Sequence, residues 1–424
     1  MFISILANNT TNAQPRSDAI LYSVLHANKN VDFQDILNHA QTYRCQVIYT
    51  QITRDKNNKP SFKDYYFNYD SLLYFNPAST VKMPLAFLAL EKLHAIAGSG
   101  VKKNTRLQID SSYPWQKASV RDPTSANGFP SIEHYIKKAF LVSDNDAYNR
   151  LYQFIGQQTI NRNLHNKGYN DVRITRQFMG VTPDQNRHTN QFRFLKEDGS
   201  LLYTQPPAYN TDSFDFSNAI KIGKGHLDKN DSLVNEPFNF TMHNNLSLED
   251  LQKMLQSVLF PGSVSKNQRF VIADTDREFL LQYLSQFPSE TNYPKYDTSK
   301  YFDSYVKFFF RDSSHKMPPN LRVFNKVGWA YGFMTDVSYV ANFANDLEFM
   351  LSATLYVNSD GILNDNKYDY ESKGYPFLRE LGNTIYQFEL HRKRAFKPDL
   401  SAFNLQYEKR DPDDKRPVIS EVDN

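Results

Sequence analysis

The stretch FNPASTVKMPLAFLAL, residues 75–90, joins a polar turn to a long apolar run. Ser79 and Lys82 stand three positions apart at the head of that run. Residues at this spacing share one face of a helix, so Lys82 is expected beside Ser79. Pro84 comes early enough in the helix for its missing N–H to do limited harm. The stretch therefore predicts a helix that begins at the serine and presents both side chains together.

Two later segments supply residues that an activated serine would need. Ser143-Asp144-Asn145 occurs once in the chain, between two helix-like stretches, and Lys326-Val327-Gly328 lies where a strand meander begins. A serine followed three residues later by a lysine also occurs at Ser99, Ser263, Ser304 and Ser313. The spacing alone therefore decides little, whereas three motifs in this order and setting indicate acyl transfer through the serine.

The three motifs divide the chemistry among them. A serine hydroxyl is a weak nucleophile at neutral pH and needs a base within hydrogen-bond reach. Lys82 is the candidate base, because burial and the nearby charge of Lys326 would favour its neutral form. Ser143 would pass the proton to the leaving group, and Asn145 would hold Lys82 and a substrate carbonyl.

An anionic intermediate also needs donors. The backbone N–H of Ser79 is free at a helix start, and the second donor is expected just after Gly328, at the N–H of Trp329. Removal of one such donor typically costs on the order of 100 to 1000-fold in rate.

Each motif also has a purely structural explanation. Ser79 could cap a helix, and the triplet at 143–145 could cap the helix predicted over residues 147–155 and closed by Gly156. Lys326 could be a solvated lysine on an edge strand. These explanations do not predict that the three motifs occur together, so catalysis is favoured.

The ten histidines give no metal signal, because none is paired at i, i+4 and no cysteine accompanies them. No metal and no other cofactor is expected. His134, His165 and His188 are predicted to be surface or packing residues. A serine, histidine and aspartate triad stays open as an alternative, although no Gly-x-Ser-x-Gly elbow supports it.

With these motifs the chain resembles the superfamily of active-site serine hydrolases that contains class A β-lactamases and penicillin-binding proteins. The likeness covers roughly residues 18–392 and is sharpest at 75–90, 141–156 and 325–340. It implies Ser79 as the acylated nucleophile and Lys326 as the anchor for a substrate carboxylate. It also implies an acyl-serine mechanism on β-lactam amides or D-Ala-D-Ala peptides.

Three departures limit the resemblance. Val327 replaces the usual hydroxyl residue between the lysine and the glycine. The Glu-x-x-Leu-Asn pattern that supplies the deacylating base in class A β-lactamases is missing after residues 173–180, where Asp184 and Glu197 are possible substitutes. An insertion near residues 192–240 is expected to wall or cover the cleft. The alternatives are therefore a penicillin-binding or peptidoglycan-binding module with little turnover, or an esterase that uses the same residues.

Composition narrows the class of protein. The chain has 424 residues and a formal net charge of +3, with charges of mixed sign, which gives no indication of nucleic-acid binding. The expected partner is a small-molecule or peptide substrate with an acyl group. The single cysteine, Cys45, excludes an internal disulfide and is predicted to be a buried thiol. Aromatic residues make up 14% of the chain, and some are expected to line a cleft for a peptide or sugar.

No stretch is long and apolar enough to span a bilayer, so no stable membrane span is expected. Residues 1–17 read as a signal remnant or a disordered start, because a short apolar stretch is followed by small and polar residues. A cell-wall substrate would favour a periplasmic or secreted location.

The pattern of elements predicts an α/β (α+β) fold, in which an antiparallel sheet flanked by N- and C-terminal helices adjoins an all-helical lobe. The α/β lobe would comprise residues 18–78 and 320–392, and the helical lobe residues 79–319. Expected elements are a helix over 18–27, a hairpin of 44–53 with 62–68, helices over 81–96, 132–142, 147–155 and 248–259, a meander of 321–326, 331–341 and 347–357, and a helix over 377–390. The charged tail 393–424 is expected to hang loose.

Overall fold

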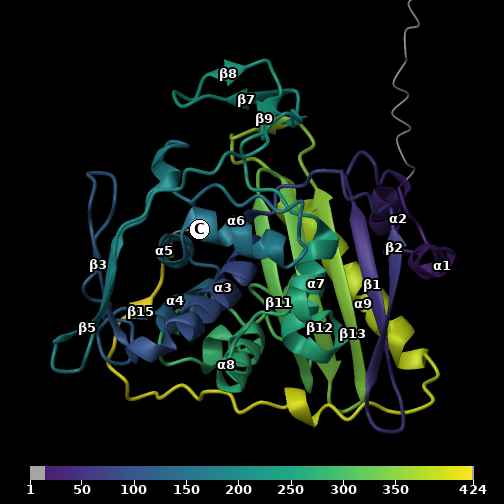
Figure 1. The fold of residues 1–424 in the computed structure, drawn as a ribbon. Coiled ribbons are helices and arrows are strands. Elements are labelled where there is room, and N and C mark those ends of the chain that lie inside the picture. Colours follow the sequence, from purple (N-terminus) through teal and green to yellow (C-terminus); the bar gives the residue numbers. More distant parts are fainter. Residues whose placement is uncertain (1–14, 423–424) are drawn as a thin grey trace, which may run out of the picture.

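The computed structural model describes residues 15–422, and its centre is one five-stranded antiparallel sheet (Figure 1). The strand order is β11-β12-β13-β1-β2. These strands are β1 (Gln46–Arg54), β2 (Pro60–Phe67), β11 (Leu321–Ala330), β12 (Phe333–Asn342) and β13 (Leu347–Tyr356). The predicted hairpin and meander are confirmed, and β1 joins them through its pairing with β13.

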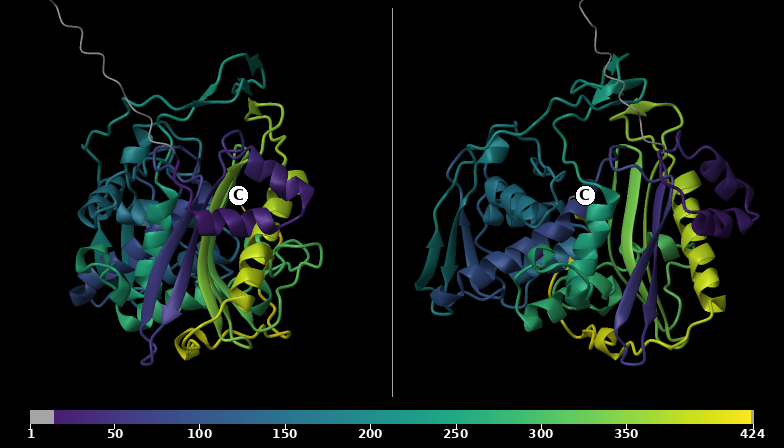
Figure 2. Two further views of the ribbon diagram at one scale, coloured as in Figure 1. Left: turned by 90° about the vertical axis from the view of Figure 1, so that its right-hand side faces the viewer. Right: turned by 45° about the vertical axis from the view of Figure 1, so that its right-hand side comes forward.

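Helices from both ends of the chain cover one face of the sheet (Figure 2). They are α1 (Ala19–Ala27), α2 (Val31–Asn38) and α9 (Tyr375–His391). Their apolar side chains, such as Leu25, Phe33 and Leu381, form one buried cluster with strand residues such as Val327 and Phe349. The free thiol of Cys45 is buried in the same cluster, and burial raises its pKa.

The helical lobe packs on the other face of the sheet. Its helices are α3 (Lys82–Ala95), α4 (Ile132–Leu141), α5 (Asn145–Ile155), α6 (Gln157–Asn166), α7 (Leu248–Leu259) and α8 (Asp274–Ser285). The first nine residues of α3 are all buried, as the apolar run at 75–90 predicts for a helix at the centre of a lobe. Together the two layers confirm the predicted α/β (α+β) fold.

The helical lobe also carries small sheets that the sequence did not reveal. One contains β3 (Arg106–Asp110), β4 (Gln191–Leu195) and β5 (Leu201–Gln205). The remaining short strands are β6 (Lys221–Ile222), β7 (Gly225–Leu227), β8 (Leu233–Val234), β9 (Phe238–Asn239), β10 (Lys295–Tyr296), β14 (Ile362–Leu363) and β15 (Val418–Ile419). Most of these strands belong to the segment where an insertion is expected, and its residues Phe192, Phe194 and Phe240 are buried in the main core.

The prediction of a loose C-terminal tail is wrong. Leu400 and Phe403 are buried against the main core, and β15 pairs in parallel with β10. Arg410 donates hydrogen bonds to the carbonyl oxygens of Pro288 and Tyr296, both at 2.9 Å. The tail therefore straps the two lobes together along the lower edge in Figure 1.

The expected signal remnant at residues 1–17 lies almost wholly outside the described residues. Residues 15–422 contain no helix that is long and apolar enough to cross a membrane.

Candidate active site

Ser79 lies at the junction of the sheet and the helical lobe. It belongs to the 3-10 turn Ala78–Val81, and α3 begins three residues later at Lys82. The predicted helix therefore starts slightly late, because Ala78 enters the turn with φ 43°, a left-handed conformation. Within residues 15–422 the Ser79 hydroxyl makes no hydrogen bond, so it stands free in a cleft. A bond to a catalytic base often forms only when substrate is present.

The ammonium group of Lys82 joins the first two motifs. Lys82 is 0% exposed although it begins a helix. Its Nζ donates to the carbonyl oxygen of Ser143, to the Ser143 hydroxyl at 3.2 Å and to Asn145 Oδ1 at 2.7 Å. Burial with several oxygen acceptors fixes the lysine in one position.

Lys326 brings in the third motif from the edge strand β11. Its Nζ donates to the Ser143 hydroxyl at 2.9 Å and to the Val327 carbonyl at 2.8 Å. Burial is the main cause that lowers the pKa of Lys326, and the charge of Lys82 lowers it further. Ser143 therefore lies between two buried amines, and the pKa of one of them, Lys326, is lowered.

The sheet and the serine turn touch at Gly328. A Cβ atom at this position would lie 2.5 Å from the Pro77 carbonyl oxygen and 2.9 Å from the Ser79 nitrogen. Only glycine permits β11 to pass this closely. The approach brings Trp329 into the wall of the same cleft as Ser79.

Non-glycine residues in left-handed conformations surround the cleft. Besides Ala78, Ser143 has φ 67° and Tyr331 has φ 54°. Such conformations cost free energy and persist where the surrounding contacts hold them, which occurs frequently at functional sites.

The cleft has a volume of about 570 Å³ and combines aromatic and amide side chains. It is lined by Asn76, Ala78, Ser79, Asn145, Arg176, Gln177, Phe178, Met179, Gly180, His243, Asn244, Trp329, Ala330, Tyr331, Asn364, Asn366, Tyr368 and Tyr370. Among these described residues there is no aspartate and no glutamate. Asp184 and Glu197 are exposed and lie outside this lining, so neither is placed to act as the deacylating base.

Phe178 belongs to the segment 173–180, after which a deacylating carboxylate is expected, and it lies in the wall of the cleft. Its ring centroid lies 5.4 Å from the Lys82 ammonium, and it stacks on Tyr148 at 4.3 Å. Asn149 fixes its backbone, because the Asn149 side chain accepts from the Phe178 N–H at 2.7 Å and donates to the Phe178 carbonyl at 3.2 Å. Nothing in the sequence around residue 178 signals this placement.

Arg176 and His243 form a second pair that the sequence did not reveal. The Arg176 guanidinium donates to His243 Nε2. Burial and the Arg176 charge lower the pKa of His243 to about 3, so the imidazole is neutral and can accept this bond. The guanidinium charge is thus not cancelled by this partner.

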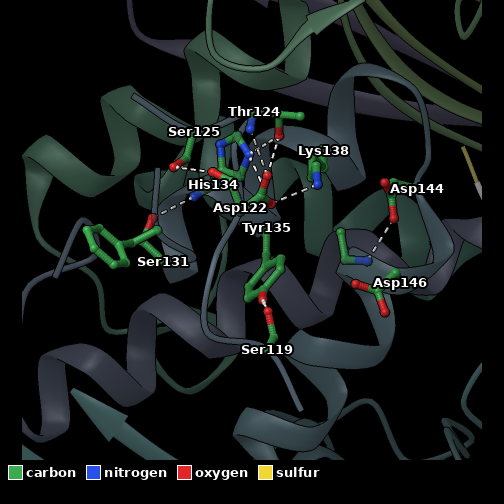
Figure 3. A network of polar contacts seen from close by, with 12 residues as sticks. Ser119, Asp122, Thr124, Ser125, Ser131, His134, Tyr135, Lys138, Asp144 and Asp146 are labelled. Carbon is green, nitrogen blue, oxygen red and sulfur yellow. Dashed lines mark hydrogen bonds and ion pairs between the residues drawn. The ribbon is translucent and has the colours of Figure 1, made fainter. Parts of the chain in front are cut away.

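The alternative triad does not form at His134, whose ring contacts a threonine and an aspartate. His134 Nε2 contacts Thr124 Oγ1 at 2.9 Å and Asp122 Oδ2 at 3.4 Å, so one ring nitrogen serves both neighbours (Figure 3). Asp122 also accepts from Lys138 at 2.9 Å. The group is a buried packing network beside the turn at Ser143, as predicted for His134. No group of three or more His, Cys, Asp or Glu within residues 15–422 could hold a metal ion.

The sequence model of the beta-lactamase enzyme family matches residues 30–388. The chain belongs to the beta-lactamase enzyme family. Membership agrees with the convergence of the three motifs on one cleft. No curated protein sequence matches the chain.

Solved β-lactamase structures are similar to this chain at low identity. A β-lactamase from Francisella tularensis shares 14% identity with a TM-score of 0.48, covering 86% of this chain and 99% of its own. A β-lactamase from Burkholderia ambifaria shares 13% with a TM-score of 0.46, covering 84% and 99%. A mutant of PBP-A, solved as an acyl-enzyme complex with penicillin G, shares 12% with a TM-score of 0.44, covering 84% and 95%.

Proposed function

We propose that this beta-lactamase family member is a serine hydrolase that opens β-lactam amides or D-Ala-D-Ala-type peptides through an acyl-serine intermediate. One observation carries the proposal. The Ser143 hydroxyl bonds to both Lys82 and Lys326 at the edge of a cleft that also contains Ser79. Helix capping and surface solvation do not account for two buried lysines on one hydroxyl.

The proposed reaction begins at Ser79. Neutral Lys82 takes the Ser79 proton while Oγ attacks the carbonyl carbon, and the backbone N–H groups of Ser79 and Trp329 stabilise the oxyanion. When the C–N bond breaks, Ser143 gives its proton to the leaving nitrogen and is reprotonated from Lys82. The product of this stage is the Ser79 ester.

Substrate recognition would use both walls of the cleft. A substrate carboxylate beside Lys326 favours the protonated ammonium form of this lysine, which then anchors the carboxylate, and Asn145 bonds the acyl amide. Val327 has no hydroxyl to offer that carboxylate. Its side chain is buried in the core on the other face of the sheet. Because cell-wall peptides lie outside the inner membrane, the proposal includes a periplasmic or secreted location.

A second candidate function is a penicillin-binding module with little turnover. The observation that favours it is the aromatic ring of Phe178 beside Lys82, in a cleft whose lining includes no carboxylate. Hydrolysis of the ester needs a base to activate water. Without such a base the acyl enzyme would persist.

Intact-mass spectrometry with a panel of β-lactams, together with a fluorescent penicillin, tests both candidates. We expect a single adduct on the wild type and none on Ser79→Ala. Ser313→Ala is a matched control, because Ser313 also precedes a lysine by three residues but is exposed. Rapid loss of the adduct supports hydrolysis, and a lasting adduct supports the binding module. An adduct that survives in Ser79→Ala refutes the site.

A further inference from the structure

A long excursion of the chain leaves the cleft after Gly180 and returns to it at His243. Its two ends are tied together at a neck. Arg173 and Asn245 exchange backbone hydrogen bonds of 2.8 and 2.9 Å, and Asn244 Oδ1 accepts from the N–H groups of Thr175 and Arg176. Residues between the two tied ends can therefore line a cavity that is separate from the cleft.

That space is a second cavity of about 300 Å³ next to the cleft. It is lined by Gln157, Thr175, Arg176, Val181, Pro183, Asn186, Arg187, Phe214, Phe216, Asn239, Met242 and His243. Arg176 and His243 also line the cleft, so this pair is a wall common to both. The volume is at the lower end of the range for small-molecule sites.

Two guanidinium groups in this lining keep donors available. Arg176 donates through Nη1 to a neutral histidine, and Arg187 donates through Nη1 to the carbonyl oxygens of Asn210 and Asp212. Neither forms an ion pair with a carboxylate within residues 15–422, and their Nε and Nη2 atoms make no hydrogen bond there. The nearby Asp212 carboxylate is held by Arg162 at 2.6 Å.

The rest of the lining is mainly apolar. Phe214, Phe216 and Met242 come from the returning half of the excursion, and Val181 and Pro183 come from the outgoing half. The Arg187 guanidinium lies 5.8 Å from the centroid of the Phe214 ring. An apolar enclosure with guanidinium N–H groups that make no hydrogen bond favours a ligand that has a hydrophobic body and one anionic, bidentate acceptor.

We propose that this second cavity binds a small carboxylate with an aromatic or branched apolar body, whose carboxylate pairs with Arg187 and Arg176. The carboxylate could belong to a free acid or to the distal end of an acyl donor that reaches past the common wall. Binding of the free acid needs no acylation, so this proposal can fail or succeed independently of the proposed function.

Calorimetric titration of 4-phenylbutyrate into the wild type and into Ser79→Ala tests the site. We expect equal binding to both proteins and at least tenfold weaker binding to Arg187→Gln, whereas Lys196→Gln, an exposed change of the same charge, leaves binding unchanged. The neutral 4-phenylbutanamide should bind at least tenfold more weakly than the acid. Arg187→Lys should restore part of the affinity if charge is what matters. Equal affinity for acid and amide, or affinity unaffected by Arg187→Gln, overturns the proposal.

A second measurement separates the two sources of the carboxylate. The acylation rates of benzylpenicillin and α-carboxybenzylpenicillin are compared in the wild type and in Arg187→Gln. If the distal end of the donor enters the cavity, the variant slows the carboxylated donor at least tenfold and leaves the other unchanged. If a free acid is the ligand, 4-phenylbutyrate binds, and Arg187→Gln changes the acylation rates of the two penicillins by the same factor. Absence of binding together with equal response of the donors refutes both.

Discussion

Phe178 lies beside Lys82, with 5.4 Å between the ring centroid and the ammonium nitrogen. The two hydrogen bonds between the Asn149 side chain and the backbone of Phe178 fix that backbone, so the position of residue 178 does not depend on its side chain. A different side chain at residue 178 would start from the same place beside the proposed base. The identity of this one residue should therefore control what happens to the acyl enzyme.

Phe178→Glu is expected to shorten the lifetime of the Ser79 ester at least tenfold, because the new carboxylate can activate water next to Lys82. The measurement is the loss of the penicillin adduct with time by intact mass. Phe178→Gln has nearly the same shape as the glutamate variant without its basicity and should leave the lifetime long. Equal lifetimes in the two variants would show that another group is the base.

Gly328→Ala is expected to slow acylation by at least 100-fold and to lower the free energy of unfolding by about 1–3 kcal/mol, as overpacking does. The new methyl group would meet the Pro77 oxygen at 2.5 Å and push β11 away from Ser79. Labelling rates and urea unfolding measure the two effects. Gly262→Ala is the control, because no atom lies within 4 Å of a Cβ there.

Lys307 should make stability depend on pH. Burial lowers its pKa from 10.5 to about 7, and its ammonium donates to the Leu284 and Val323 carbonyls and to Asn325. Between these values the unfolded chain holds a proton that the folded chain lacks, so stability rises with pH. From pH 7 to 9 the free energy of unfolding of the wild type should rise by about 2 kcal/mol more than that of Lys307→Met. Chemical denaturation at both pH values measures this, and parallel changes would contradict it.

Phe403→Ala should lower the free energy of unfolding by about 3–5 kcal/mol, because the ring is buried in the core between Phe260 and Tyr339. Phe396→Ala, in the same tail at 47% exposure, should change it by less than about 0.5 kcal/mol. Equal effects in denaturant titrations would mean that the tail does not contribute to the core.

The sequence could predict the elements that have a regular pattern. The apolar run at 75–90, the hairpin of β1 and β2 and the meander of β11, β12 and β13 each follow from periodicity and turn residues. Because Ser79, Ser143 and Lys326 each stand at the end or edge of such an element, their meeting at one junction could also be expected.

Other features depend on contacts that no local pattern encodes. Phe178 reaches the cleft only because Asn149, on another element, fixes its backbone. Arg176 and His243, which are hydrogen-bonded to each other, lie 67 positions apart in the sequence. The prediction of a loose tail was wrong because proline and charged residues dominate the composition of the tail. Leu400 and Phe403, three positions apart, were the signal of a buried turn.

The neck at Thr175 and Asn244 has a consequence for how this chain can vary. It holds the two ends of the excursion together. The length of the excursion therefore does not determine the positions of the reacting side chains. Loop-closure entropy rises only slowly with length, so changes in the length of the exposed loops beyond such a tie are tolerable, whereas Phe192, Phe194 and Phe240 are buried in the main core. The residues that would select the far end of a ligand and the residues that would break the bond thus lie in different segments of the chain. One set can be redesigned while the other is kept.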